Sequence, residues 1–542
     1  MAPPEIGDGG RLLRDLYRSF WTPPTDDRES IRIGLIPSGS KIRFRALERM
    51  RIRAYSEVGS WEVASPNDVI WVVETRRIVR PAVVSYFAGV EHRLRGRGEH
   101  HPNSDAERWK SRGYLSARWV GPSAMDLEIG GSTTERWVLS LTPPTSEAIA
   151  QSACGDAKKA WKVSCHVYGR VELPPLVQAN LRAENSNFSK EFSGFLEILS
   201  PQGPVELLDF VAEDRVGEPS AEWFGPRLFV VPGLDATLSF VQSTPFFSYL
   251  EGVVPSEMFS SAPPEALRSQ AIIARTYAVR NVFPEYSTRP FVVCASTNCQ
   301  VYRGLKLKKP EVSASIHDTA NLVVRETSGA LAETFYHSIC GGHTEPRKGI
   351  WGGASQPYLD GVDDEIGSSP TYPLNNDARV EQYLLSPPSS YCGRATLTRE
   401  DRWRWKVTLS RKDLDRIAES QGLRPPLTDI RVRKRGISGR ALDLDLIAGT
   451  ETKRIRGELE IRMLFGGLLS SLFVLRSVQN GGAIDSLDIS GGGYGHGVGL
   501  CQMGAIGRAE AGQSYRQILE AYYPGTHVAS LSPGGVAAGM VK

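Results

Sequence analysis

The chain changes character at the stretch Pro263-Pro-Glu-Ala-Leu-Arg-Ser-Gln-Ala-Ile-Ile-Ala-Arg-Thr-Tyr-Ala278. Prolines followed by an acidic residue are favoured in the first turn of a helix, and apolar residues then recur at helical spacing from Leu267 to Ala278. The stretch therefore predicts a helix over residues 264–281. It also marks a border between two parts of the chain that differ in pattern, and the change begins near Phe246.

The part upstream of Phe246 is predicted to be rich in β-strands. Short apolar or alternating runs, broken by Gly, Pro, Asn and Asp, recur at residues 31–36, 69–73, 137–141, 161–165 and 228–231. Such runs are typical of strands. We expect residues 31–244 to form a β-rich accessory region, preceded by a disordered N-terminal segment over residues 1–30.

The part downstream is predicted to be a mixed α+β domain. Residues 402–475 follow a rhythm of their own, with a Trp-rich strand, a helix over residues 412–421 and two further strands. This predicts a small α+β insert over residues 376–485. The domain itself is expected to comprise residues 245–375 and 486–530, followed by a tail over residues 531–542. The predicted fold class is therefore α+β.

Length and charge exclude several classes of protein. A chain of 542 residues is longer than one hydrophobic core usually organises. Its 64 Lys and Arg against 61 Asp and Glu leave a net charge of +3, which argues against nucleic acid as the principal partner. The longest apolar run, residues 465–475, is shorter than the roughly 20 residues that span a bilayer. The N-terminus is too charged for a secretory signal.

Three groups of motifs carry the polar side chains of interest. They are Tyr249-Leu-Glu-Gly-Val-Val-Pro-Ser-Glu-Met258, the pair Cys299-Gln-Val-Tyr-Arg-Gly304 and Tyr336-His-Ser-Ile-Cys-Gly-Gly-His-Thr344, and the glycine loop Gly493-Tyr-Gly-His-Gly-Val-Gly-Leu-Cys-Gln-Met-Gly-Ala505. The glycine loop lacks both a Gly-Lys-Ser/Thr ending and Gly-x-Gly-x-x-Gly spacing, so a phosphate site is disfavoured. Together the motifs resemble the sporulation stage II protein D family, which shares a domain with the amidase-enhancer proteins of bacterial cell walls. The resemblance covers about residues 246–528.

The resemblance implies a peptidoglycan lytic transglycosylase, a carbon–oxygen lyase. Enzymes of this family cut the β-1,4 bond between N-acetylmuramic acid and N-acetylglucosamine without water, and leave a 1,6-anhydro sugar. The catalytic glutamate of the family corresponds to Glu257. One carboxyl group can serve as general acid and then as general base. A conventional hydrolase would need a second carboxylate roughly 5–10 Å away, for which Glu251, Glu265 and the acidic residues between 360 and 365 are candidates.

Alternative readings stay open for several residues. Glu257 could instead cap the following helix. The resemblance implies substrate contacts from Arg275, Tyr277, Gln300, Tyr336, Thr344, Tyr494, His496 and Gln502. Arg275 could instead form a structural salt bridge, and His496 could be a structural histidine.

A group of Cys and His residues suggests a metal site or a disulfide. The group consists of Cys294, Cys299, His337, Cys340 and His343. Four of these five could hold a structural zinc, because tetrahedral zinc favours thiolate and imidazole ligands. A disulfide from Cys340 to Cys299 or Cys294 is the competing interpretation, and free thiols are the third. The chemistry itself requires no cofactor. Cys154, Cys165, Cys392 and Cys501 are expected to be packed or incidental.

Partners and location follow from the substrate that the resemblance implies. The expected partner is the peptidoglycan glycan strand, and the β-rich region would support the domain or bind the wall. Peptidoglycan lies outside the cytoplasmic membrane, so we expect a periplasmic, wall-associated or secreted protein with an export signal upstream of the first residue. A second hypothesis is a non-catalytic, wall-binding enhancer of an N-acetylmuramoyl-L-alanine amidase. A zinc hydrolase is a third, weaker hypothesis.

Overall fold

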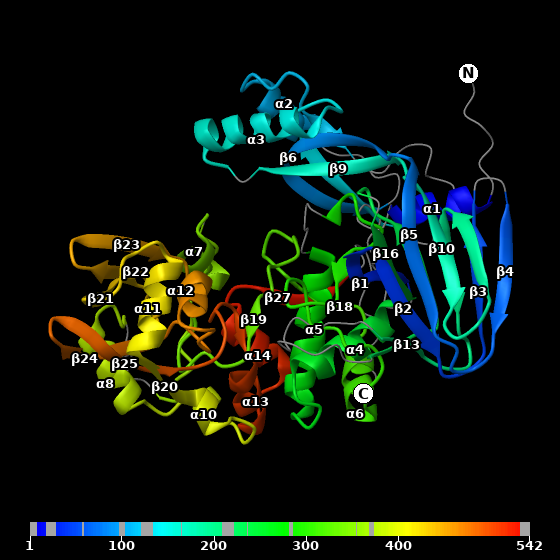
Figure 1. Cartoon of the computed structure of the whole chain (residues 1–542). Coiled ribbons are helices and arrows are strands. Elements are labelled where there is room, and N and C mark those ends of the chain that lie inside the picture. Colours follow the sequence, from blue (N-terminus) through cyan, green and yellow to red (C-terminus); the bar gives the residue numbers. More distant parts are fainter. Residues whose placement is uncertain are drawn as a thin grey trace, which may run out of the picture. The chain divides into compact units, whose positions relative to one another are not determined.

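The protein has an α+β fold, as predicted (Figure 1). The computed structural model describes residues 8–17, 29–56, 59–96, 103–120, 134–163, 165–208, 222–235, 237–280, 286–353, 355–367 and 373–531. The chain divides into two compact units. Unit 1 comprises residues 1–259, 278–322 and 530–542, and unit 2 comprises residues 260–277 and 323–529. Residues predicted to form a single domain from position 245 onward thus contribute to both units.

Unit 1 is dominated by three sheets, in agreement with the predicted β-rich region. The seven-stranded sheet runs in the order β17 (Val293–Cys294), β1 (Ser30–Gly39), β16 (Leu238–Pro245), β15 (Arg227–Pro232), β12 (Phe195–Leu199), β3 (Met50–Tyr55) and β4 (Ser60–Ser65). The six-stranded sheet runs in the order β11 (Ser189–Ser193), β10 (Leu176–Ala183), β5 (Trp71–Arg80), β2 (Lys41–Ala46), β13 (Val205–Leu207) and β14 (Glu222–Phe224). The four-stranded sheet runs in the order β7 (Arg118–Val120), β8 (Thr134–Ser140), β6 (Val83–Gly96) and β9 (His166–Leu173).

The core of unit 1 lies between its two larger sheets. The rings of Phe44 on β2 and Phe240 on β16 are both fully buried, and their centroids are 5.8 Å apart. The helices of unit 1 are α1 (Asp8–Tyr17), α2 (Asn103–Lys110), α3 (Glu147–Trp161), α4 (Phe246–Glu257) and α6 (Pro310–Asp318).

Two predictions for unit 1 need correction. Residues 8–17, predicted to be disordered, form α1, because Leu16 and Tyr17 pack into a buried cluster with Phe195. The remainder of the segment up to residue 28 lies outside the described residues. The strand predicted at residues 161–165 is also wrong. Helix α3 continues to Trp161, ends in a left-handed residue at Lys162, and β9 begins only at His166.

Unit 2 contains the predicted helix as α5 (Pro264–Arg280), of which residues 264–277 are assigned to this unit. Two three-stranded sheets share a core with two helices. One sheet runs in the order β20 (Arg404–Ser410), β25 (Ala483–Gly492) and β24 (Phe473–Asn480). The other runs in the order β21 (Asp429–Arg435), β22 (Ala441–Ala448) and β23 (Glu451–Arg456). These helices are α11 (Arg411–Ser420) and α12 (Glu458–Leu464). The bounds of α11 differ by one residue from the predicted helix over residues 412–421, and a capping box of Ser410 and Asp413 begins it.

Short elements of unit 2 carry most of the predicted site residues. Two-stranded sheets join β18 (Leu322–Arg325) to β27 (His527–Ser530) and β19 (Tyr336–His337) to β26 (Leu500–Cys501). The remaining helices are α7 (Arg347–Trp351), η3 (Pro357–Leu359), α8 (Asp377–Leu385), α9 (Tyr391–Arg394), α10 (Glu400–Trp403), α13 (Gln502–Glu510) and α14 (Tyr515–Tyr522). Among the described residues, no helix combines the length and the hydrophobicity needed to cross a bilayer.

Candidate functional site

Glu257 is the last residue of helix α4 in unit 1 and is partly buried. The helix starts directly after strand β16, so the seven-stranded sheet fixes its position. The backbone N–H of Val301 donates to Glu257 Oε1 at 2.7 Å. The carboxylate is therefore held by the end of one helix and by a backbone donor from a distant loop.

The loop that contains Val301 is packed closely onto helix α4. Gln300 Nε2 donates to the hydroxyl of Tyr249 at 2.9 Å, and the ring of Tyr302 stacks on Tyr249 with centroids 5.5 Å apart. Gly252 permits this approach, because a Cβ at that position would lie 2.4 Å from the ring of Tyr302. The predicted substrate residue Gln300 is thus a buried partner of Tyr249.

The other carboxylates considered for a second catalytic role take part in structural contacts. In unit 1, Glu251 is only 3% exposed, accepts from the Ser313 hydroxyl and pairs with Lys308 Nζ at 2.9 Å. In unit 2, Glu265 Oε2 accepts the N–H of Tyr515 at 2.6 Å. Asp360 Oδ1 accepts from the Ser355 hydroxyl at 2.6 Å.

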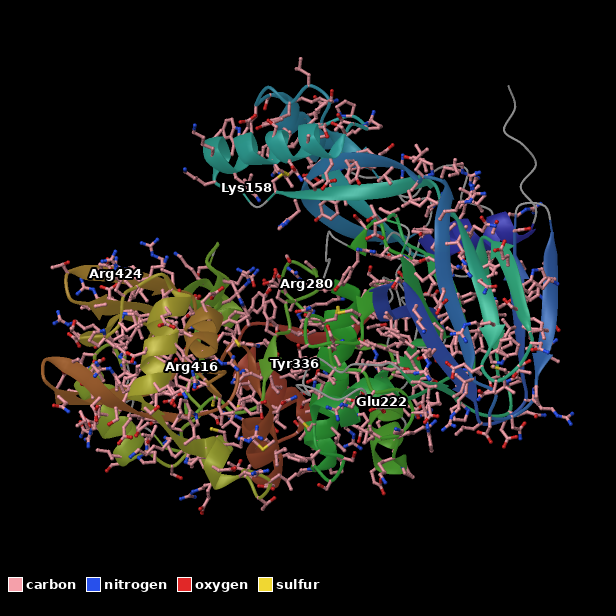
Figure 2. The ribbon with its side chains drawn as sticks, in the orientation of Figure 1. Lys158, Glu222, Arg280, Tyr336, Arg416 and Arg424 are labelled. Carbon is pink, nitrogen blue, oxygen red and sulfur yellow. A yellow bond between two sulfur atoms is a disulfide. The ribbon has the colours of Figure 1, made fainter. Side chains whose placement is uncertain are left out.

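Unit 2 brings a row of aromatic side chains together. The indole of Trp351, which is 47% exposed, lies 5.0 Å from the ring of His496 and 4.7 Å from that of Phe335. Phe335 in turn meets Tyr277 at 6.4 Å, edge to face. Tyr336, labelled in Figure 2, lies on β19 and meets Tyr277 at 6.3 Å. Sequence reasoning missed Trp351, although it lies shortly after the motif that ends at Thr344.

His337 presents a buried nitrogen that has no hydrogen-bond partner among the described residues. The side chain is 5% exposed and lies 5.5 Å from the ring of His496. Its Nδ1 lies 3.1 Å from the carbonyl oxygen of Val498, so Nδ1 carries the proton and Nε2 is left as an acceptor. An unpaired buried polar atom costs about 1–3 kcal/mol, so Nε2 is an unsatisfied acceptor inside unit 2.

Burial keeps the histidines of this region neutral. It lowers the pKa of His337 well below 6.5, with the neighbouring His496 and the Arg440 charge acting in the same direction. Burial, opposed by a backbone hydrogen bond, lowers the pKa of His343 to about 4. The same cause, assisted by Arg440 and Arg462, lowers the pKa of the partly exposed His496. Near pH 7 all three rings are therefore uncharged.

These shifts predict that the protein loses stability in mild acid. In the unfolded chain His337 and His343 take up protons near pH 6.5, whereas folded His343 does so only near pH 4. The free energy of unfolding is therefore unaffected by these histidines above pH 6.5. It declines as the pH falls toward 4, by up to about 1.4 kcal/mol per pH unit for each histidine. Urea unfolding between about pH 7.5 and pH 5 measures the slope. His343→Gln should flatten it, and the same change at exposed His527 should not; equal slopes in both variants would contradict the prediction.

Arg440 is the buried charge that organises the loops of unit 2. Its guanidinium donates to the carbonyl oxygens of Cys340 at 2.8 Å and His343 at 3.3 Å, and to the Ser438 hydroxyl at 2.8 Å. Gly497 packs against it, since a Cβ there would lie 2.3 Å from Arg440 Cζ. Gly497 is thereby explained by close packing on Arg440, whereas Gly493, Gly495 and Gly499 pack against Ile339, His337 and Phe335.

The remaining predicted contacts are largely internal to unit 2. Arg275 is fully buried in α5 and donates to the carbonyl oxygen of Ala271. Thr344 Oγ1 accepts the N–H of Val362 at 2.7 Å. Gln502 Nε2 donates to Gln270 at 3.4 Å, and the ring of Tyr494 carries the Arg402 guanidinium at 4.8 Å.

The cysteines fit neither the predicted zinc site nor a disulfide to Cys340, whereas Cys340 itself is a free thiol, the third interpretation. Cys294 and Cys299 form a disulfide with each other, so neither is available to the predicted zinc site or to Cys340. Their separation by only five residues and the turn after β17 bring them together. Cys154 and Cys165, expected to be incidental, also form a disulfide. Cys340 is a buried free thiol and instead approaches two cysteines that were set aside, Cys392 and Cys501.

Comparison with known proteins agrees with the motifs. A family model described as stage II sporulation protein matches residues 235–332, and a model for a domain of unknown function matches residues 345–499. The chain is 29% identical over 325 residues to an uncharacterized protein of Brachyspira hyodysenteriae. The aligned region covers 60% of this chain and 76% of the Brachyspira protein.

Two named relatives extend the comparison. The amidase enhancer of Bacillus subtilis is 30% identical over 303 residues, covering 52% of this chain but only 40% of the enhancer. The stage II sporulation protein D of Bacillus amyloliquefaciens is 27% identical over 301 residues, covering 53% of this chain and 75% of that protein. Residues 235–332 are therefore similar to the stage II sporulation protein family, and more than half of the chain is similar to proteins named amidase enhancer and stage II sporulation protein D.

Proposed function

We propose that this protein is a peptidoglycan lytic transglycosylase in which Glu257 is the catalytic acid and base. The observation that supports this most directly is the position of Glu257 inside the family-matching region, at the end of α4, with Val301 N–H on its carboxylate. The reaction would cleave the β-1,4 bond between N-acetylmuramic acid and N-acetylglucosamine and leave a 1,6-anhydro end.

The proton balance needs only one carboxyl group. Protonated Glu257 would donate its proton to the glycosidic oxygen as that oxygen leaves the muramic acid C1. The resulting carboxylate would then accept the proton of the muramic acid 6-hydroxyl while O6 bonds to C1. The Val301 N–H would hold the carboxylate in place through both proton transfers.

Glycan recognition would involve the aromatic row of unit 2. Aromatic rings offer flat apolar surface, and sites for small ligands combine such surface with a few placed polar groups. Trp351 would supply exposed surface, and the neutral His337 Nε2 would accept from a sugar hydroxyl. Tyr277, Tyr336 and His496 would complete this surface; Arg275, Gln300, Thr344, Tyr494 and Gln502 remain predicted contacts.

Trp351→Ala should weaken glycan binding while leaving stability nearly unchanged. The side chain is 47% exposed, and loss of one aromatic contact of about 0.5–1.5 kcal/mol corresponds to about 2- to 12-fold in affinity. Isothermal titration with peptide-free glycan fragments measures the change. Trp161→Ala, at a 41% exposed tryptophan of α3, is the control. Equal affinities of the Trp351 variant and wild type would remove Trp351 from the binding surface.

Product analysis tests the activity itself. Glycan strands stripped of peptides are incubated with the protein and examined by mass spectrometry for 1,6-anhydro ends. Their formation by wild type, and its loss in Glu257→Gln, is the expected result. Wild type that forms none would sink the catalytic proposal.

The alternative function is that of a non-catalytic enhancer of an N-acetylmuramoyl-L-alanine amidase. It is favoured by the similarity to a protein named amidase enhancer. In an assay with whole sacculi and such an amidase, an enhancer would accelerate peptide release equally as wild type and as Glu257→Gln, with no anhydro ends in either case.

A location in the cell envelope follows from both functions. Two disulfides, Cys154–Cys165 and Cys294–Cys299, agree with it, because disulfides persist mainly outside the reducing cytoplasm.

A further inference from the structure

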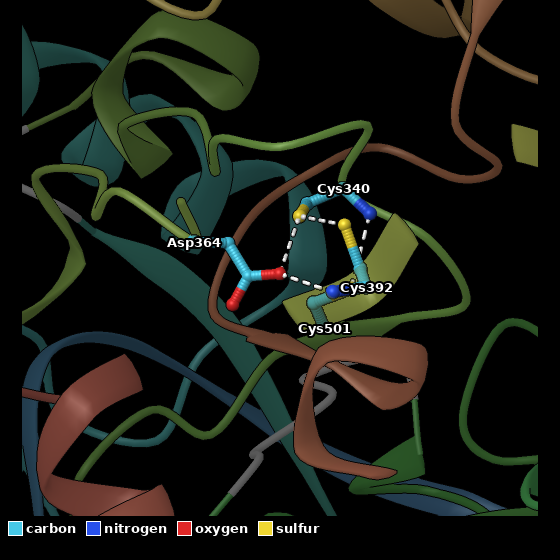
Figure 3. Close-up of side chains that lie close together, drawn as sticks. All are labelled: Cys340, Asp364, Cys392 and Cys501. Atoms are coloured by element: carbon cyan, nitrogen blue, oxygen red, sulfur yellow. Dashed lines mark hydrogen bonds between the residues drawn. The ribbon is translucent and has the colours of Figure 1, made fainter. Parts of the chain in front are cut away.

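Four buried side chains from separate segments of unit 2 converge on one point (Figure 3). Cys340 follows strand β19, Asp364 lies in the loop after η3, Cys392 is in α9 and Cys501 ends β26. Cys340 and Cys501 are 161 residues apart in sequence. None of the four has more than a trace of exposed surface. Such a gathering of three thiols and one carboxylate has no role in the chemistry assigned to Glu257.

The spacing of the four ligand atoms matches a closed tetrahedral site. All lie within 4.8 Å of one another. Zinc with bonds of about 2.3 Å to sulfur and about 2.1 Å to oxygen separates neighbouring ligand atoms by about 3.5–3.8 Å. Cys340 Sγ lies 3.3 Å from Cys392 Sγ and 3.7 Å from Asp364 Oδ2. A central ion therefore requires shifts of only a few tenths of an ångström at these pairs.

Backbone donors are already directed at the sulfurs. Cys501 Sγ accepts the N–H of Cys340 at 3.1 Å and the N–H of Gly504 at 3.3 Å. Cys340 Sγ accepts the N–H of Gly342 at 3.4 Å. Hydrogen bonds to sulfur favour the thiolate, which is the form that binds metal.

Asp364 is oriented by its surroundings so that one oxygen faces the sulfurs. Its Oδ1 accepts from the Tyr522 hydroxyl at 2.6 Å and pairs with Arg508 Nη2 at 3.4 Å. Its Oδ2 accepts the N–H of Cys392 at 2.9 Å and is the oxygen nearest to Cys340 Sγ. Outer partners of this kind fix metal-binding carboxylates, and Arg508 offsets part of the negative charge of such a ligand set.

We propose that Cys340, Cys392, Cys501 and Asp364 bind one structural zinc ion. Three thiolates and a carboxylate form a soft, four-coordinate set that suits zinc, and full burial leaves no position for a water or a substrate. The ion would join the loop after His337, the loop before α8, helix α9 and the start of α13. It would thereby hold strand β19, which carries His337, and the glycine loop that carries His496.

Metal analysis of the full chain is the first test. Protein purified without chelator or reductant should contain about one zinc per chain by mass spectrometry of the elements. Exchange of zinc for Co²⁺ should produce a near-ultraviolet charge-transfer band from thiolate to cobalt and the intense visible bands of tetrahedral cobalt. The cobalt spectrum uses wild type, so it does not depend on whether a ligand variant folds.

Variants then assign the ligands. Cys392→Ser and Asp364→Asn should each lower the zinc content and alter the cobalt bands. The double variant Cys154→Ser, Cys165→Ser removes two cysteines of unit 1 and should retain both signals.

Three results would overturn the proposal. They are the absence of zinc and of a cobalt–thiolate band after metal addition, the finding of iron in place of zinc, or a Cys340–Cys392 disulfide in peptides mapped without reduction. None of these results bears on the product assay with Glu257→Gln, so the two proposals fail independently.

Discussion

Glu257→Gln is expected to lower the formation of 1,6-anhydro ends by at least about 10²–10⁴-fold, the contribution typical of one general acid or base. The amide can neither protonate the glycosidic oxygen nor accept the proton of the 6-hydroxyl. Its carbonyl oxygen can still accept the N–H of Val301, so the end of α4 should remain in place. Initial rates from quantitative mass spectrometry of the products measure the effect.

The matched control for this variant is Glu311→Gln. Glu311 lies in the first turn of α6 in the same unit and is exposed. It should retain the wild-type rate, and both variants should unfold at the wild-type temperature. A Glu257→Gln protein that forms anhydro ends at the wild-type rate would exclude Glu257 as the acid and base.

Gly497→Ala is expected to destabilise the protein by about 2–5 kcal/mol. The residue has a φ of 84°, where a side chain costs about 1–2 kcal/mol, and the added Cβ would lie 2.3 Å from Arg440 Cζ. Overpacking of this kind typically costs a further 1–3 kcal/mol or so. Displacing Arg440 would also break its hydrogen bonds to Cys340, His343 and Ser438. Denaturant unfolding measures the loss.

Gly512→Ala separates the two causes. Gly512 has the same φ of 84°, but no atom lies within 4 Å of its added Cβ. This variant should lose only the backbone part, about 1–2 kcal/mol. Equal losses in the two variants would show that the packing of Gly497 on Arg440 contributes nothing.

Local patterns predicted the elements of this chain well where tertiary contacts did not compete. The spacing of Leu267, Ala271 and Ala274 placed helix α5, which is seen over Pro264–Arg280. The alternation at residues 161–165 misled, because the Lys162 cap and the Cys154–Cys165 disulfide decide that segment. A period of two over five residues cannot reveal either constraint.

The candidate site was only partly visible in the sequence for a similar reason. Motifs indicated Glu257 and His496, yet Val301 offers a backbone N–H, which no side-chain pattern records. The predicted ligand set placed Cys340 with Cys294 and Cys299, whereas the fold places it beside Cys392 and Cys501, which are 52 and 161 residues away in sequence. Contacts between segments that lie far apart in the sequence depend on topology, which the local pattern of a single sequence does not record.

The pairing of strand β1 has a consequence for dissecting this protein. Strand β1, near the start of the chain, lies between β16 and β17 and pairs with β17 in parallel, Ile33 opposite Val293. The loop that presents Val301 to Glu257 begins where β17 ends. A shortened protein that starts at residue 245 would keep every motif of the family but lack the neighbour that anchors this loop. Strands β1 and β16 are thus part of the scaffold that positions Glu257 and Val301.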